Sequence, residues 1–439
     1  MERHELSTLA ARFKRVMSET ELNKLGRAVR FCHRERLLTP FRLALSLVGS
    51  FALRQVETIA DLQRAFNALF ETEVAYKPFH NQLAKRQFAD FMRELASRML
   101  EALVVKVLEV GRKGAFAEFR RIVIQDGSSF AVKDVLARHY PGRFRTVSPA
   151  AVELHVTLDL LEESVARVAL TPDTAPERTE LPAPDTLGGA LLLADRGYFD
   201  REYLAQVSAA GGSFVVRAPV DINPRVLAAY GDTGERLRGW GAQKKLQDGP
   251  RLPRRGFADL DVVWHFTGGS LTARLIVSWN AADREYRYLV TNLPRERYTP
   301  ADIARSYRLR WQVELLFKEW KSYANLHAFD TANAGIVEGL IWAAIGAATL
   351  KRYLAHATQR LMGVETSTRK AAMCATHVLG DILEALLCGG HRALLAAFDR
   401  AVRYLAVNAK GASANNCYTP AWAAILSACR MRKYQAASG

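Results

Sequence analysis

Two aspartates and one helix carry the residue types from which this sequence could build a reactive site. Asp126 lies in IVIQDGSS and Asp195 lies in LLLADRGY, each where an apolar run gives way to turn-forming residues. Such positions project a side chain at the rim of a sheet. Because Asp close before Gly is also an ordinary turn signal, neither aspartate indicates a function when it is taken alone.

The segment 303–322, IARSYRLRWQVELLFKEWKS, is predicted to be a helix with two unlike faces. At about 100° per residue, one face collects a carboxylate, three cations and two aromatic rings: Tyr307, Arg310, Trp311, Glu314, Lys318 and Lys321. The other side is an apolar stripe that would dock the helix: Leu309, Val313, Leu316, Phe317 and Trp320. The alternative is a surface helix with charge pairs such as Glu314 with Lys318, each contributing about 0.2–0.5 kcal/mol. A solvated face rarely needs Tyr and Trp, which favours function.

Charge is divided unevenly along the 439 residues. The formal net charge is +16 and 49% of the residues are hydrophobic, which excludes disordered and collagen-like chains. Residues 1–120 and 331–439 each carry a net +7, whereas residues 121–212 hold 13 acidic and nine basic side chains. Basic segments around an acidic centre suit metal-dependent chemistry on nucleic acid, because the centre would need cations to approach phosphate. An Arg-rich coding bias is the alternative.

Hydrophobic periodicity divides the chain into three parts. Residues 1–120 are helical almost throughout, which fits a helix-turn-helix type of DNA reader or a plain bundle equally well. From residue 121 the pattern is three strands, a Pro-rich link, a strand, a helix over 201–210 and another strand, an α/β order with one mixed sheet. A β-rich tract at about 219–299 precedes a helical signal that continues to the end, apart from 411–420.

Several other classes of protein are disfavoured. Five cysteines without a Cys-x-x-Cys pair argue against a disulfide scaffold and a structural zinc site. The N-terminus lacks the apolar core of a signal peptide, so export is not indicated. The apolar run from Gly335 to Leu350 has 16 residues and includes Glu338, which is short of the roughly 18–20 needed to span a bilayer. It is predicted to be a buried helix.

The helix face and the two aspartates together carry a family resemblance. Tyr307-x2-Arg310-x3-Glu314-x6-Lys321 resembles the Y-x2-R-x3-E-x6-K signature of the DDE transposases of bacterial insertion sequences, specifically insertion-sequence family four. Asp126 in IQDGSS, Asp195 in ADRGYF and the TNLP at 291–294 add to it. The resemblance covers about residues 121–330, and the two helical ends match only in general character.

The resemblance implies an α/β fold: a ribonuclease H-like mixed sheet core with a β-rich insertion, flanked by N- and C-terminal helical regions. Residues 1–120 would bind DNA ends, and residues 121–330 would form the catalytic core, with the insertion at about 219–299. Residues 331–439 would form a helical region that could dimerise. The apolar helix starting near Ile336 is one candidate dimer contact, although these helices could equally pack within one subunit.

Three carboxylates at one site would suit attack on a phosphodiester by a poor nucleophile. Two hard divalent cations about 3.5–4 Å apart stabilise the entering and leaving oxygens, and oxygen ligands hold Mg²⁺ or Mn²⁺ best. The resemblance implies two such ions per active site. Asp126 would bridge them, with Asp195 on one ion and Glu314 on the other.

The resemblance also implies which side chains bind DNA. Tyr307, Arg310 and Lys321 would hold phosphates near the scissile bond, and Trp311 would stack on a flipped base. Tyr286 and Tyr288 lie where the family would place an aromatic wedge, although REYRYLV is also an ordinary strand. Further expected DNA contacts are Arg196, Tyr198 and Lys318.

The implied reaction is nicking at the element end, a hairpin on that end, its reopening and strand transfer. The expected partners are the terminal inverted repeats and target DNA, bound by a homodimer, since two ends must be cut in concert. We expect a bacterial cytoplasmic, nucleoid-associated protein with no membrane partner. Two alternatives stay open: a metal-dependent nuclease on the same core without strand transfer, and a non-catalytic DNA-binding protein.

Overall fold

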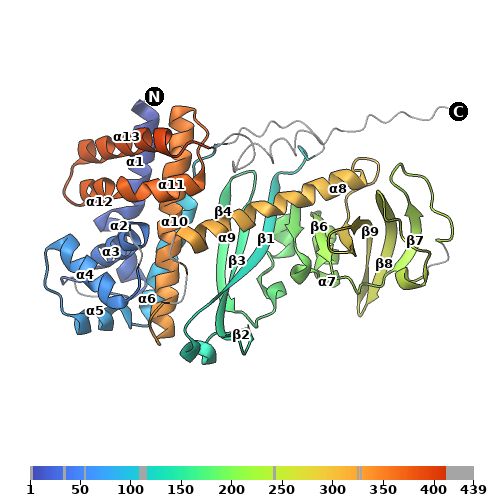
Figure 1. The fold of residues 1–439 in the computed structure, drawn as a ribbon, viewed down its shortest axis with the longest axis horizontal. Coiled ribbons are helices and arrows are strands. Elements are labelled where there is room, and N and C mark those ends of the chain that lie inside the picture. Colours follow the sequence, from blue (N-terminus) through green and yellow to red (C-terminus); the bar gives the residue numbers. More distant parts are fainter. Residues whose placement is uncertain are drawn as a thin grey trace.

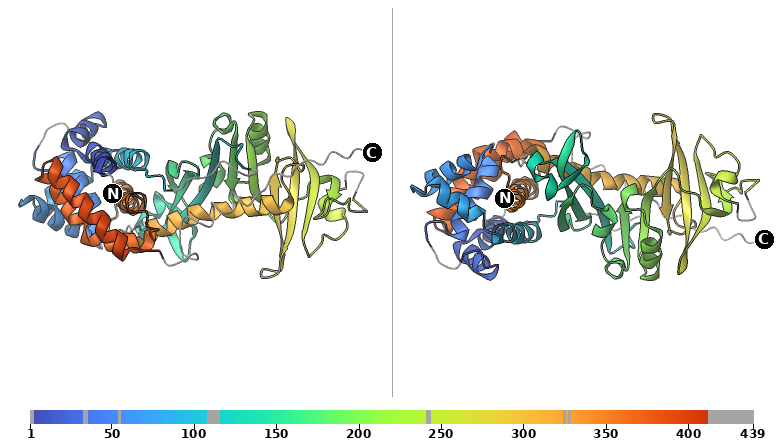
Figure 2. Two further views of the ribbon diagram at one scale, coloured as in Figure 1. Left: turned by 90° about the horizontal axis from the view of Figure 1, so that it is seen from above. Right: turned by 90° about the horizontal axis from the view of Figure 1, so that it is seen from below.

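The computed structural model describes residues 3–32, 36–53, 56–107, 116–240, 244–323, 326 and 329–411. The molecule is elongated, with a helical unit at one end and a long sheet that extends to the other end (Figures 1 and 2). The helical segment of residues 300–323 lies along the sheet and leads back to the helical unit. The predicted break at 411–420 lies, from residue 412 on, outside the described residues.

Helices from both ends of the chain build the helical unit. The N-terminal part supplies α1 (Arg3–Met17), α2 (Glu19–Ala28), α3 (Pro40–Leu53), α4 (Ile59–Phe70), α5 (Tyr76–Leu83) and α6 (Gln87–Ala102). The C-terminal part supplies α10 (Ala334–Met362), α11 (Thr368–Cys374), α12 (Leu379–Leu387) and α13 (His391–Asn408). Their buried apolar side chains belong to one hydrophobic cluster. The two terminal regions therefore share a core.

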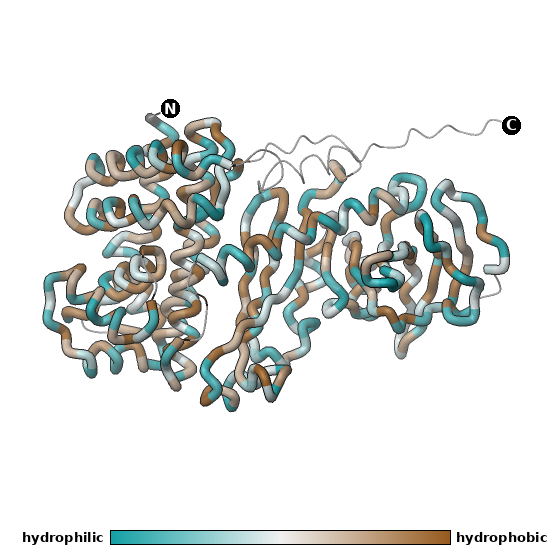
Figure 3. Tube along the Cα trace, in the orientation of Figure 1, coloured by the Kyte–Doolittle hydropathy of each residue, from teal (hydrophilic) through white to brown (hydrophobic). Residues whose placement is uncertain are grey.

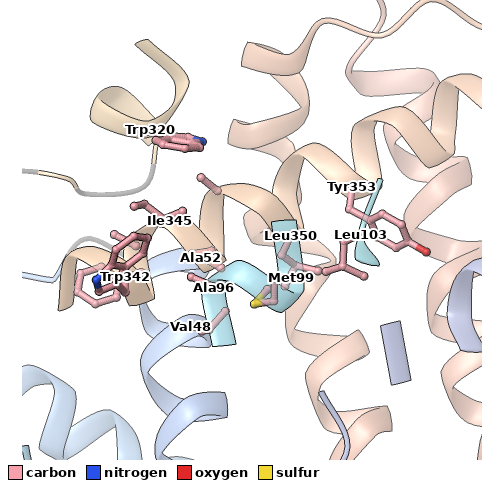
Figure 4. Packing of buried hydrophobic residues seen from close by; sticks show 14 of the residues in the cluster. Val48, Ala52, Ala96, Met99, Leu103, Trp320, Trp342, Ile345, Leu350 and Tyr353 are labelled. Atoms are coloured by element: carbon pink, nitrogen blue, oxygen red, sulfur yellow. The ribbon is translucent and has the colours of Figure 1, made fainter. Parts of the chain in front are cut away.

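The long helix α10 is the centre of that core. It packs against α3, α6 and α13, and Figure 4 shows Leu350 of α10 among the cluster residues, together with Met99 of α6. Gly339 permits the close approach of α6, because a Cβ atom there would lie 2.2 Å from Cε1 of Phe88. α10 is long and apolar enough to cross a membrane, yet 83% of its most apolar window is buried inside the protein. The prediction of a buried helix is confirmed, and α10 packs within the subunit.

The sheet has the strand order of a ribonuclease H-like fold. Its central strands are β1 (Arg121–Ala131), β3 (Ser148–Asp159), β4 (Ser164–Pro172), β5 (Ala190–Ala194) and β6 (Ser213–Ala218), in the spatial order β4-β3-β1-β5-β6. β3 runs antiparallel to β1 and β4, whereas β1, β5 and β6 are parallel. The helix α7 (Arg201–Ala209) connects β5 to β6. The predicted fold class is confirmed, and Figure 3 shows hydrophobic residues concentrated along these strands and inside the helical unit.

The β-rich tract extends this sheet and does not form a separate one. β10 (Glu285–Thr291) pairs with β6, and β9 (Gly269–Asn280), β8 (Phe257–Phe266) and β7 (Arg225–Tyr230) follow in that order. β7 was not predicted from the sequence. The buried Arg274 makes a paired contact with Asp259 and donates to the carbonyls of Leu293 and Tyr298, at 2.7 and 3.1 Å. The insertion is thereby fixed to the chain that leads into the next helix.

The helix predicted over 303–322 is not continuous. α8 (Pro300–Tyr307) begins with a capping box between Thr299 and Asp302, and a 3₁₀ turn, η6 (Arg308–Arg310), separates it from α9 (Trp311–Tyr323). A 3₁₀ turn has 3.0 residues per turn, so the 100° spacing does not carry across it. The prediction of one helix is wrong at this point, although the predicted apolar stripe from Leu309 to Trp320 is buried as expected.

Candidate active site

Strand pairing brings Asp126 and Asp195 to neighbouring positions in the sheet. In the parallel pair of β1 and β5, Gln125 lies opposite Ala194, so the two aspartates are the next residues on adjacent strands, which lie about 4.8 Å apart. Ile122 and Ile124 share the face of Asp126 because side chains alternate along a strand, and both belong to the cluster that includes the apolar residues of α9. Asp126 therefore faces α9.

Arg310 joins the aspartate of β1 to the glutamate of α9. Its Nη1 contacts Asp126 Oδ2 and its Nη2 contacts Glu314 Oε1. Its Nε is buried and has no hydrogen-bond partner within the described part of the chain. The guanidinium thus lies between two of the three predicted catalytic carboxylates.

Tyr307 makes the corresponding link to the third carboxylate. Its hydroxyl donates a hydrogen bond of 2.8 Å to Asp195 Oδ1, and its ring lies 5.7 Å from the Arg310 guanidinium carbon. Burial and the charge of Asp195 raise the pKa of Tyr307, so the phenol keeps its proton for this bond. Through Tyr307 and Arg310, the structure brings Asp126, Asp195 and Glu314 into one site, despite the break between α8 and α9.

The site holds more negative than positive charge. Burial raises the pKa of Asp126 to about 7, Arg310 opposes this rise, and Asp195 and Glu314 add to it. One guanidinium therefore faces three carboxylates in a partly desolvated place. Such a site has the electrostatic character that favours added cations.

The donor chemistry fits a hard divalent cation, since all three acids offer carboxylate oxygens. Within the described residues, no three His, Cys, Asp or Glu side chains are grouped closely enough to hold a metal ion as they stand. The guanidinium of Arg310 lies between Asp126 and Glu314 and contacts both carboxylates.

The cations beyond Glu314 differ in their surroundings. Lys321 donates to Ser128 Oγ at 2.7 Å and to the Ser129 carbonyl at 2.6 Å, which fixes α9 to the end of β1. Burial lowers the pKa of Lys321. Lys318 is exposed, and Trp311 is 57% exposed at the start of α9. The side chains of Lys318 and Trp311, each about one helical turn from Glu314, are therefore accessible to solvent.

Of the two predicted DNA contacts that follow Asp195, only one is accessible. Both lie in the 3₁₀ turn η4 (Arg196–Tyr198). Arg196 is exposed, whereas Tyr198 is 1% exposed and forms a 3.0 Å hydrogen bond with Nδ1 of His155. The prediction that Tyr198 contacts DNA is wrong, because its ring lies in the core and connects the turn after Asp195 to β3.

Trp279, in the insertion, was missed in the sequence, and it lies beside Tyr286, which was named as a candidate wedge residue. The ring of Trp279 lies 4.8 Å from that of Tyr286, in an edge contact, and the Arg254 guanidinium lies 4.5 Å from the Trp279 ring. The Tyr286 hydroxyl donates to the Leu252 carbonyl at 2.7 Å. A Trp at the end of the strand LTARLIVSW was a usable signal, because β9 and β10 pair Trp279 directly with Tyr286.

A ribonuclease H-like sheet with aspartates at two adjacent strands, faced by a glutamate from a following helix, is an arrangement that could hold the cations of phosphodiester chemistry. The chain belongs to the transposase DDE domain family, whose model matches residues 117–350, more than half of the chain. It is accordingly an enzyme that acts on DNA, from a family that uses divalent metal ions. The family resemblance found in the sequence is confirmed.

Individual relatives agree with this assignment. The chain is 22% identical over 371 residues to the transposase for insertion sequence element IS231F of Bacillus thuringiensis subsp. israelensis, covering 76% of this chain and 77% of the relative. It is 20% identical over 357 residues to the transposase for IS1151 of Clostridium perfringens, covering 72% and 74%. A 62-residue stretch is 40% identical to the putative transposase InsL for IS186A of Escherichia coli K12, covering 14% and 17%.

A comparison of folds gave a solved structure, the cryo-EM structure of the piggyBac transposase synaptic complex with hairpin DNA. It is 9% identical in sequence, with a TM-score of 0.46, and the match covers 91% of this chain and 85% of the other.

Proposed function

We propose that this enzyme cleaves DNA at the ends of an insertion sequence and joins those ends to target DNA. The observation that carries the proposal is the convergence of Asp126, Asp195 and Glu314 through Tyr307 and Arg310. The names of the relatives support insertion-sequence ends as the substrate. A hairpin on the cleaved end is part of the proposal and rests on the family signature.

Asp126, Asp195 and Glu314 are the residues that would hold the divalent cations, with Mg²⁺ or Mn²⁺ as the expected ions and two per site. The cations would stabilise the charge that develops on the entering and leaving oxygens of the phosphodiester. The excess of negative charge around the buried Asp126 supports this assignment.

The protein's own side chains would hold the DNA. Arg310 would exchange its carboxylate partners for a phosphate of the strand, since a guanidinium binds phosphate with the same two-pronged geometry. Tyr307 would orient Asp195, and Lys321 and the exposed Lys318 and Arg196 would contact backbone phosphates. Trp311 would stack on an unpaired base, and the group of Trp279 and Tyr286 is a second candidate for that role.

The other parts of the chain have proposed roles as well. Residues 1–120 would recognise the terminal inverted repeats, and a homodimer would hold two ends together. The apolar face of α10 is buried within the subunit. The two subunits would therefore contact each other through another part of residues 331–439, or would be held together by the DNA that both bind. The protein would act in the cytoplasm, at the nucleoid.

The test uses the purified protein and the DNA that flanks its own gene. We expect cleavage at the inverted repeats with Mg²⁺ or Mn²⁺, and joining of a pre-cleaved end to a second duplex. Cleavage without joining would favour the metal-dependent nuclease. Binding without cleavage, unchanged when Asp126, Asp195 or Glu314 is replaced by Ala, would favour the non-catalytic DNA-binding protein.

A further inference from the structure

A short hairpin next to the active-site strand exposes apolar side chains to solvent. It is formed by β2 (Pro141–Phe144) and the start of β3, and residues 143–147 are all exposed. Phe144 is 66% exposed and Val147 is 86% exposed. Val135 is 60% exposed in the 3₁₀ helix η1 (Asp134–Arg138), which packs against β2 and β3.

The base of this hairpin is firmly held. The backbone N–H of Arg143 donates to Asp173 Oδ2 at 2.8 Å, and its guanidinium donates to the Asp173 carbonyl at 3.1 Å and to Glu153 at 3.4 Å. Gly142 permits the tight pairing of the two strands, because a Cβ atom there would lie 1.9 Å from the Ser148 carbonyl oxygen. Phe144 is therefore exposed on a hairpin that these hydrogen bonds hold in place.

The charge around the tip is suited to a polyanion. Arg138 and Arg145 are both exposed, and the ion pairs found among the described residues include neither of them. Lys133, which directly precedes η1, forms an ion pair with Asp330 at 2.5 Å. Two uncommitted guanidinium groups beside an exposed aromatic ring are the combination by which proteins contact a duplex backbone and insert an apolar wedge between base steps.

Strand register sets the distance between the tip and the active site. On β3, Val156 lies opposite Asp126 and Ser148 lies opposite Phe144. These eight residues span about 26 Å at about 3.3 Å per residue, which equals roughly eight base-pair steps of about 3.4 Å. Figure 1 shows β2 at the lower end of the sheet, beyond the crossing of α9. A duplex with its scissile phosphate at Asp126 could reach the tip within one helical turn.

We propose that the tip binds the duplex that continues past the cleavage point, outside the element end. Phe144 enters the minor groove, and Arg138 and Arg145 hold the adjacent phosphates. The minor groove presents a degenerate pattern of hydrogen-bonding groups, so a wedge that enters it suits DNA whose sequence differs from one insertion site to the next. This inference rests on the proposed function, because it assumes that the active site holds an element end.

The test compares two DNA duplexes: an element end with about 15 base pairs of flank, and the same end pre-cleaved. Phe144→Ala should weaken binding of the flanked duplex by about tenfold, as for a lost wedge, and Arg145→Ala by a few-fold, as for one lost phosphate contact. Both variants should bind the pre-cleaved end like the wild type. Val407→Ala, at a site 70% exposed on α13, is the matched control and should bind both duplexes like the wild type. 2-Aminopurine placed about eight base pairs outside the cleavage point should brighten with the wild type and not with Phe144→Ala.

Three results would overturn the inference. Equal affinity of all variants for the flanked duplex would remove the contact. An equal loss on both duplexes would place it on the element end. A lower oligomeric mass of Phe144→Ala in the absence of DNA would assign the tip to a second copy of the chain. Failure of the wild type to bind either duplex would contradict the proposed function and can be told apart from all three.

Discussion

The two faces of β1 differ in how their polar side chains are satisfied. On one face, Gln125 accepts a hydrogen bond of 2.6 Å from Thr157, and His155 of the paired strand bonds Tyr198 at 3.0 Å and Thr171 at 2.9 Å. On the other face, Asp126 shares one guanidinium with Glu314, and the Nε of that guanidinium has no hydrogen bond within the described residues. The polar side chains on one face of β1 are thus hydrogen-bonded to one another, whereas on the other face one buried donor of Arg310 has no hydrogen bond within the described residues.

The two faces of β1 therefore differ in their roles: the face of Gln125 supports the fold, and the face of Asp126 carries the candidate active site. A buried polar group without a partner costs stability, and strongly perturbed pKa values cluster at functional sites; the surroundings of Asp126 combine both features. The face of Gln125, which we call the paired face, connects β1, β3 and the turn after Asp195 through hydrogen bonds. We call these connected elements the frame. The face of Asp126 carries excess negative charge on that frame, which the proposed function assigns to the binding of cations.

The largest expected effect comes from the unsatisfied face. Asp126→Asn should lower the cleavage rate at least about a thousandfold, because a neutral amide is a poor ligand for the cations. Asn retains the size of Asp and an acceptor for Arg310, so the Tm should stay within about 5 °C of the wild type. Cleavage assays and calorimetry check both. Asp381→Asn, exposed on α12, is the control, and a similar rate loss there would contradict the assignment.

Gly127 lies on the same face of β1 as Gln125, and replacing it should disturb the contacts of His155 and Tyr198. A Cβ atom at this position would lie 2.7 Å from Glu153 Oε1 and 3.0 Å from the Tyr198 hydroxyl. Gly127→Ala should therefore lower the free energy of unfolding by about 1–3 kcal/mol, measured by urea denaturation. Gly380→Ala, in a helix with nothing near the added methyl, should be neutral or stabilising. If both variants are equally stable, the packing of the frame is looser than described.

The paired face should also make stability depend on pH. Burial lowers the pKa of His155 to about 4, whereas a histidine in the unfolded chain titrates near 6.5. As the pH falls below about 6.5, His155 binds a proton in the unfolded chain but not in the folded protein, so its contribution to the free energy of unfolding is lost towards pH 4. Burial raises the pKa values of Asp126 and Glu153 to about 7, which acts in the opposite direction, so the contribution of His155 is measured as a difference between the wild type and a variant. The loss should reach at most about 1.4 kcal/mol per pH unit.

Urea denaturation in metal-free buffer between pH 4.5 and 7 measures this dependence. His155→Gln keeps a polar side chain of similar size without the titration, so the wild type should lose stability relative to this variant as the pH falls from about 6.5 towards 4. Parallel pH profiles for the two proteins would show that His155 is not the responsible group.

The smallest expected effect is at an exposed cation beside the active site. Lys318→Ala should weaken DNA binding only a few-fold and reduce the slope of log K against log salt by about 1, as for one lost phosphate contact. Its free energy of unfolding should stay within about 0.5 kcal/mol of the wild type. A salt slope equal to that of the wild type would remove Lys318 from the DNA-binding residues.

Much of this fold could be predicted from local pattern. The strands of the core, the helix after Asp195 and the buried stripe of Leu309, Val313 and Leu316 follow from periodicity. The 3₁₀ turn at Arg308–Arg310 could not, because helical spacing alone does not reveal a change of pitch. The packing of the N-terminal helices against the C-terminal helices could not be predicted either. It depends on contacts between residues more than 200 positions apart in the sequence, such as those between α6 and α10.

The candidate site was predictable in part for a similar reason. The signature spacing and the two aspartates pointed to the residues that the structure brings together. Tyr198 was expected to contact DNA from its place in the motif ADRGYF, whereas in the structure its ring is buried and its hydroxyl is bonded to His155 on a distant strand. Trp279 was missed because its role depends on pairing with Tyr286 across two strands.

The most direct measurement of the central claim is a crystal structure of the protein with element-end DNA and Mn²⁺, with the ions located by their anomalous scattering. We expect Mn²⁺ at about 2 Å from carboxylate oxygens of Asp126, Asp195 and Glu314, with Arg310 turned to a DNA phosphate. Ions bound elsewhere, with Arg310 still between Asp126 and Glu314, would contradict it.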